Sequence, residues 1–151
     1  MLTFYRTGRV YHGLGNVLCS LEKYDEGEQY HRKAVAQWQS TIGENHHKTA
    51  DGYIRVARHC MRRMDQLDEA ASLIEKALSI YQRRPEVYKP QIARTLFTKA
   101  QLLMANGAEQ ESVVVLKQAA ALRNQLSWTS NKTEREVRES DFDELVILWS
   151  R

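Results

Sequence analysis

The chain has 151 residues, a length that fits one domain of ordinary size with a buried core. Its seven glycines and two prolines are too few for the frequent turns of a β-sandwich or barrel, and its 42% hydrophobic and 27% charged residues exclude a disordered segment. A net charge of +3 is too small for a dedicated nucleic-acid binder, and no apolar run is long enough to span a membrane.

The first part of the chain predicts a pair of helices. Tyr11, Leu14 and Leu18 are spaced by three and four residues, which places them on one helical face. A turn at Glu22-Lys23 follows, and Ala34 belongs to a second helical pattern. We therefore expect helices over 7–21 and 24–40.

The same pair of patterns recurs twice further along the chain. Ala77 lies 43 residues after Ala34, and Ala119 lies 42 residues after Ala77. Turn residues divide each later unit, at Asp65-Gln66 and at Asn106-Gly107. The repeat predicts helices over 49–64, 67–83, 90–105 and 108–126. The third unit is the most divergent, with Lys99 and Glu109 where the other units favour apolar residues.

The end of the chain differs from the repeats. Residues 127–140 are polar and charged, which is typical of a partly disordered linker. The apolar side of 141–150 predicts a short helix. A stacked array exposes the hydrophobic side of its last unit, so we expect Phe142, Leu145 and Trp149 to cap the helix at 108–126. No comparable cap precedes the first helix, so we expect either that the chain is the tail of a longer array or that it self-associates there.

These residues resemble the tetratricopeptide repeat family. The 42-residue step and the linker Gly43-Glu44-Asn45-His46-His47-Lys48-Thr49-Ala50 are similar to its kinesin light chain-like subclass, with His47 in place of a proline. The chain's ending also resembles the C-terminal segments of fungal proteins with such repeats.

The resemblance implies an all-α, right-handed solenoid of three helix-turn-helix pairs plus a C-terminal capping helix. The array would occupy 1–126, with units at about 7–43, 50–86 and 92–126. The linker would occupy 127–140, and the cap 141–151.

Motifs for catalysis and metal binding are incomplete in the sequence. His46, His47, His59 and Cys60 lack the paired spacing of a structural zinc site, and neither Cys19 nor Cys60 stands at a helix start that would activate a nucleophile. Gly13-Leu14-Gly15 lacks the rest of a phosphate-binding loop. The sequence therefore predicts a non-catalytic protein with no metal and no cofactor.

In a solenoid of this type the first helix of each unit lines a concave groove. The groove face predicted from the sequence is basic, which favours an acidic or carboxylate-bearing peptide held mainly by Arg55, Arg62 and Asn16. The candidate groove residues are Arg9, His12, Asn16, Arg55, His59, Arg62, Arg63, Arg94, Phe97 and Gln101.

The predicted function is a protein interaction module. A self-assembly module that pairs through its N-terminal end is the alternative, and a nucleic-acid-binding helical repeat is a weaker one. The first residues do not read as a signal peptide, so we expect an intracellular, cytoplasmic protein with reduced cysteines.

Overall fold

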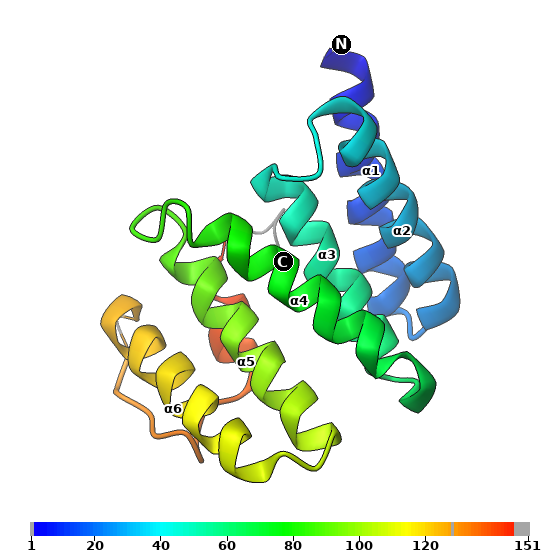
Figure 1. Ribbon diagram of the computed structural model, residues 1–151. Helices are drawn as coiled ribbons and strands as arrows, with labels where there is room; N and C mark the ends of the chain where they lie inside the picture. The colour runs from blue at the N-terminus through cyan, green and yellow to red at the C-terminus, as the bar shows by residue number, and fades with distance from the viewer. Residues whose placement is uncertain (1, 128, 147–151) are drawn as a thin grey trace.

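The computed structural model describes residues 2–127 and 129–146, and all regular secondary structure in these ranges is helical (Figure 1). The helices pack as consecutive antiparallel pairs, α1 with α2, α3 with α4 and α5 with α6, and each pair contacts the next. The elements are α1 Leu2–Ser20, α2 Tyr24–Thr41, α3 His47–Cys60, the 3-10 helix η1 Met64–Gln66, α4 Leu67–Tyr81, α5 Lys89–Ala105, α6 Glu109–Leu126 and α7 Glu139–Asp143.

The register of the repeat is visible in the core. Ala34, Ala77 and Ala119, the residues that define the period, are all fully buried at 0% exposure. A small side chain is needed at each of these positions because two helices cross there closely. The predicted three-unit arrangement is therefore confirmed.

Helix α3 covers residues 47–60, whereas the prediction was 49–64. Its C-terminal end differs from the prediction more than that of any other repeat helix. It begins early because Nδ1 of His46 accepts a hydrogen bond from the backbone N–H of Lys48 at 3.1 Å, which caps the helix. It ends early because the chain turns after Cys60 and enters the short helix η1. Helix α1 begins at Leu2, five residues before the predicted start.

The C-terminal segment folds back, but its helix is not where the sequence placed it. Helix α7 covers Glu139–Asp143, and the described residues after it, 144–146, are not helical. The predicted helix over 141–150 is therefore wrong in its start and in this part. Residues 147–151, with the predicted contact of Trp149, lie outside the described residues.

The segment packs chiefly on α5, in contrast to the predicted contact with α6 alone (Figure 1, red, behind α5). Phe142 is fully buried and stacks on Phe97 of α5, with ring centroids 4.6 Å apart. Val137 and Phe142 join a small core with Ala119 and Ala120 of α6. The ring of Phe142 determines where this segment packs, because Phe97 on α5 is a larger apolar partner than Ala119 and Ala120 on α6.

The described residues of the predicted linker contact the C-terminal end of α6. Arg123 near the end of α6 donates a hydrogen bond to the carbonyl of Ser130 at 2.8 Å, and Asn124 donates to the carbonyl of Lys132 at 2.8 Å. The polar end of α6 thus satisfies two backbone carbonyls of this segment, and its partial disorder stays a prediction. Among the described helices, none has the length and apolar character required to cross a membrane.

Candidate binding groove and histidine cluster

The basic face on the first helices of units two and three is partly covered by the chain's own acidic segment. The guanidinium group of Arg58 on α3 lies 2.6 Å from the carboxylate of Glu139 and 3.6 Å from that of Asp143. Arg94 on α5 is 1% exposed and lies 3.9 Å from Asp143. With Phe97 under Phe142, the groove predicted over unit three is occupied by residues 139–143.

Two of the predicted groove arginines stand beside this covered region. Arg55 and Arg62 line a cavity of about 370 Å³ whose wall includes Arg58 and Glu139. The Arg62 guanidinium lies over the ring of Tyr24, 3.5 Å from its centroid.

Arg55 carries a poorly compensated positive charge. Burial, together with the nearby Arg58 and Arg94 guanidinium groups, lowers the pKa of Arg55. Its Nε atom is buried and has no hydrogen-bond partner among the described residues. A guanidinium group in this situation favours an anionic ligand, because an anion restores both the charge balance and the missing hydrogen bonds.

Arg63 is paired within the structure. It forms ion pairs with Glu28 and, at 3.1 Å, with Asp25, both from α2. These three residues line a second cavity of about 290 Å³ together with Arg62. Arg63 therefore ties α2 to the end of α3, and its charge is already neutralised by protein carboxylates.

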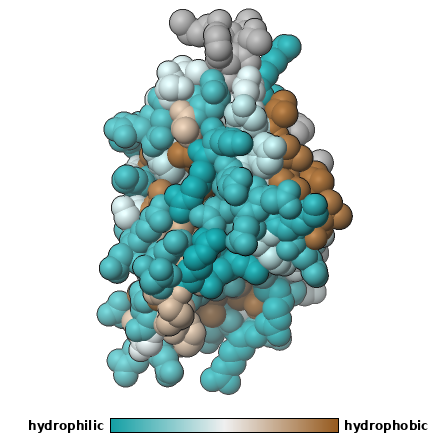
Figure 2. Space-filling model, turned by 90° about the vertical axis from the view of Figure 1, so that its right-hand side faces the viewer, coloured by the Kyte–Doolittle hydropathy of each residue, from teal (hydrophilic) through white to brown (hydrophobic). Residues whose placement is uncertain are grey.

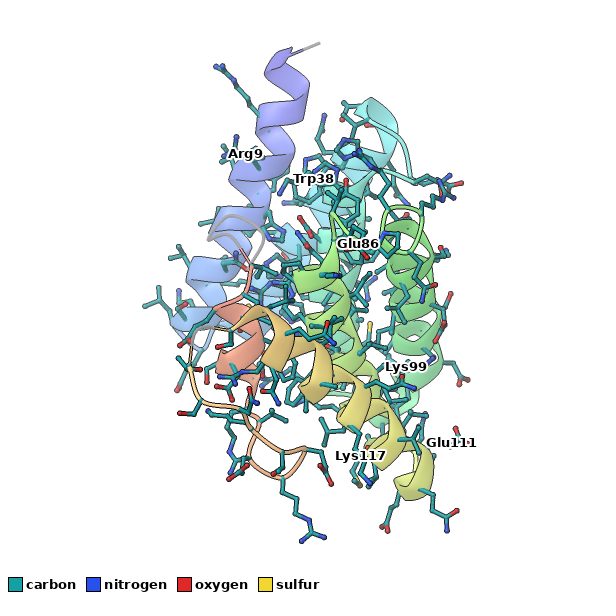
Figure 3. All side chains as sticks on the ribbon, turned by 90° about the vertical axis from the view of Figure 1, so that its left-hand side faces the viewer. Arg9, Trp38, Glu86, Lys99, Glu111 and Lys117 are labelled. Atoms are coloured by element: carbon teal, nitrogen blue, oxygen red, sulfur yellow. The ribbon has the colours of Figure 1, made fainter. Side chains whose placement is uncertain are left out.

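The remaining predicted groove residues have different surroundings. His12 is 2% exposed and packs against Trp38, with ring centroids 5.4 Å apart. Gln101 is exposed and lines a separate cavity of about 380 Å³ beside Phe97. Arg9 is exposed on α1 and is set apart from the C-terminal segment in Figure 3. The structure thus does not bring the ten residues together into one groove.

His59 and Asn16 belong to a polar cluster between the first three helices. Nδ1 of His31 on α2 lies 2.8 Å from Nε2 of His59 on α3, and Nε2 of His31 lies 3.1 Å from Oδ1 of Asn16 on α1. The thiol of Cys19, also on α1, lies 3.8 Å from Nε2 of His59. His31 and His59 are 1% and 6% exposed, and both line the cavity beside Arg55 and Arg62.

The histidines and the cysteine of this cluster carry no charge. Burial, with the charges of His12 and Arg55, lowers the pKa of His31 to about 2. Burial also lowers the pKa of His59 to about 4, a shift that the nearby carboxylate of Glu28 opposes and Arg55 reinforces. Burial raises the pKa of the Cys19 thiol despite Arg55 and Arg62. All three groups are therefore uncharged near neutral pH.

Sequence reasoning missed Arg58, Cys19 and His31. Arg58 is absent from the predicted groove residues, although its side chain pairs with Glu139. The acidic residues at 139, 141 and 143 are complementary in charge to the basic face predicted for the first helices. This complementarity could have predicted that the segment binds there. Cys19 and His31 gave no signal, because their partners lie on other helices.

Comparisons with known proteins agree with this architecture. Residues 6–60 match the tetratricopeptide repeat family. The Arabidopsis thaliana protein KINESIN LIGHT CHAIN-RELATED 3 is 28% identical over 107 residues, which are 71% of this chain and 16% of that protein. The crystal structure of BtubC (BKLC) from P. vanneervenii superimposes with a TM-score of 0.68 at 20% identity, covering 87% of this chain and 52% of that one.

The fold and these matches agree: the chain is an all-α, right-handed superhelix of helix pairs, and its residues 6–60 are similar to tetratricopeptide repeats. In sequence the chain is similar to a kinesin light chain-related protein, as the 42-residue step predicted. The resemblance to fungal proteins stays a prediction.

Proposed function

We propose that the chain is a non-catalytic interaction module that binds an acidic peptide segment of another protein on its concave surface. Repeats of this class support a protein-binding scaffold. The observation that carries the proposal is the chain's own segment 139–143, which places Glu139 and Asp143 against Arg58 and inserts Phe142 beside Phe97. That contact supports a ligand with carboxylates and an aromatic anchor.

The space for a partner lies next to the bound segment. Arg55 and Arg62 line the cavity of about 370 Å³ that Glu139 borders, so a partner's carboxylates would meet these two guanidinium groups. Asn16 is not among the residues that line this cavity, and its Oδ1 is directed at His31. The proposal therefore rests on the two arginines and drops the asparagine as a central contact.

The test is a titration of a library of acidic peptides, each with one aromatic residue, against the full chain by fluorescence anisotropy. We expect Kd values of about micromolar size, because partly exposed ion pairs contribute only about 0.2–1 kcal/mol each. Arg55→Gln with Arg62→Gln should weaken binding about tenfold or more, since both charges act on the same carboxylates. Added salt should also weaken it.

Two further variants sharpen this experiment. Arg84→Gln removes an exposed positive charge outside the cavity and should leave the affinity unchanged. Glu139→Gln removes the carboxylate nearest Arg58 and should strengthen binding, because a competing negative charge is gone. Equal binding by the parent and the double variant would place the site elsewhere. Failure of every peptide to bind would favour the second candidate below.

A hydrophobic stripe on α1 favours self-association as that second candidate. Val10, Leu14, Val17 and Leu21 are 65%, 37%, 55% and 63% exposed, and hydrophobic side chains line one edge of the molecule in Figure 2. One repeat further on, 43 residues later, the first three positions are Tyr53, Ala57 and Cys60, which are buried. There Tyr53 and Cys60 receive hydrogen bonds from Gln39 and Arg32 of α2.

The stripe thus corresponds to the surface that, in the second unit, packs against α2 of the preceding unit. We propose a second copy of this chain as its occupant, with α1 packed on α1 of the partner copy. Light scattering should then detect a dimer whose population grows with concentration. Val10→Glu with Val17→Glu should give a monomer, whereas Val114→Glu, at an exposed position on α6, should not. A monomeric parent at high concentration contradicts this candidate.

A further inference from the structure

Three potential metal ligands converge between α1, α2 and α3. The donor atoms of Cys19, His31 and His59 all lie within 4.8 Å of one another. The two imidazole nitrogens that face each other are 2.8 Å apart, and the sulfur is 3.8 Å from the nearer one. We propose that these three residues form a binding site for a thiophilic d10 metal ion, Zn²⁺ or Cu⁺.

The distances are close to those that coordination requires. Zn–N bonds of 2.0–2.1 Å and a Zn–S bond of 2.3 Å at tetrahedral angles imply about 3.3 Å between two nitrogens and about 3.6 Å between nitrogen and sulfur. The histidine nitrogens must therefore separate by about 0.5 Å, and the sulfur must approach the nitrogen of His59 by about 0.2 Å and that of His31 by up to about 1.2 Å. Binding therefore requires rotations of the three side chains toward a common centre.

A neighbouring amide orients one of the ligands. Oδ1 of Asn16 accepts a hydrogen bond from Nε2–H of His31, so the lone pair of His31 lies on Nδ1, the atom that faces His59. In metal sites a ligating histidine commonly donates its other N–H to an oxygen in this way. In the metal-free chain Nε2–H of His59 therefore donates a hydrogen bond to Nδ1 of His31. When Nε2 of His59 binds a metal ion, the proton of this ring moves to its Nδ1.

The helix contacts are shaped to hold these side chains. A Cβ atom on Gly15 would collide with the ring of His31, and one on Gly27 would lie 2.7 Å from the sulfur of Cys19. Glycine at both positions lets α1 and α2 approach closely while the two ligands lie between them. The three ligands also line the cavity of about 370 Å³, which gives a metal ion an entry path and leaves one coordination position open.

The charges around the site favour the ion of lower charge, because Arg55 and Arg62 line the same cavity. Histidine binds a metal ion as the neutral imidazole, and cysteine binds it as the thiolate. The Cys19 thiol releases its proton to water and becomes a thiolate. Cu⁺ with one thiolate is then neutral as a group, whereas Zn²⁺ leaves a net positive charge near Arg55 and Arg62. We therefore expect Cu⁺ to bind more tightly than Zn²⁺.

The experiment is a metal titration of the reduced, metal-free full chain under anaerobic conditions. Co²⁺ reports the zinc geometry through its visible ligand-field bands and a near-ultraviolet thiolate band, and competition with a Cu⁺ chelator measures the copper arm. We expect one equivalent per chain. Cys19→Ala and His59→Gln should each lower the affinity by about tenfold or more and remove or alter the thiolate band.

Two controls separate this site from other histidines and cysteines. Cys60→Ala removes the other thiol, and His46→Gln with His47→Gln removes the other histidine pair; neither change should affect binding. Circular dichroism of every variant verifies that it is folded. Absence of stoichiometric binding of either ion, or equal binding by the parent and a folded Cys19→Ala chain, overturns the proposal. Because the readout is metal binding itself, it is independent of the peptide titration.

Discussion

Replacing Ala77 with arginine is expected to lower the free energy of unfolding by about 4 kcal/mol. Ala77 on α4 is 0% exposed and belongs to the main core, with Cys60 and Ile74 among its members. An arginine there introduces several methylene groups into a closely packed helix crossing and a charge without a partner. Both effects destabilise the fold, and the second is the larger because the charge loses its hydration.

Urea unfolding followed by circular dichroism measures this change. Ala36→Arg is the matched control, because Ala36 lies within α2 but is exposed, and its substitution should change stability by less than about 0.5 kcal/mol. In a domain of this size the Ala77 variant should also melt about 10 °C lower. If both arginine variants are equally stable, the repeat register described above is incorrect.

Asp51→Ala is expected to be nearly as damaging, at about 3–5 kcal/mol. The Asp51 carboxylate is 1% exposed and joins three helices. It accepts hydrogen bonds from the hydroxyl of Tyr81 at 2.7 Å and from Nζ of Lys48 at 3.1 Å, and it lies 4.0 Å from the guanidinium of Arg94. Without this carboxylate, the buried cations Lys48 and Arg94 lose a neighbouring negative charge, which destabilises the fold.

Two variants divide the contributions of this carboxylate. Tyr81→Phe removes one hydrogen bond and should destabilise the chain by about 1 kcal/mol. Asp51→Asn keeps the shape of the side chain but removes the charge, so its effect should lie between those of Tyr81→Phe and Asp51→Ala. Thermal and urea unfolding of all three chains gives the ranking. An Asp51→Ala chain no less stable than the Tyr81→Phe chain would show that the carboxylate contributes little to the fold.

The positions of the helices and their pairing were predictable from the sequence. Ala34, Ala77 and Ala119 recur at a nearly constant step, and all three are buried at helix crossings. This information is local, because a spacing of three and four residues determines which face of a helix is apolar, and the step between alanines determines how units stack. Helix ends were less predictable where a side chain such as His46 acts as a cap.

The candidate sites depended on contacts between residues far apart in the sequence. The acidic character of residues 139–143 was visible, but their position against Arg58 and Arg94 follows from the stacking of Phe142 on Phe97. That ring contact, together with the charge pairing, draws the segment onto α5. No periodic pattern encodes where a single aromatic side chain finds its partner.

The histidine cluster shows most clearly what the sequence determines and what depends on the tertiary structure. The sequence by itself determined that Cys19, His31 and His59 lie on three consecutive helices, since each falls within a periodic segment. Only the tertiary structure decided that their donor atoms meet within 4.8 Å. The physical reason is that helix spacing and rotation depend on the side chains at each crossing, here on Gly15 and Gly27, and a change of a few ångströms there would separate the three ligands.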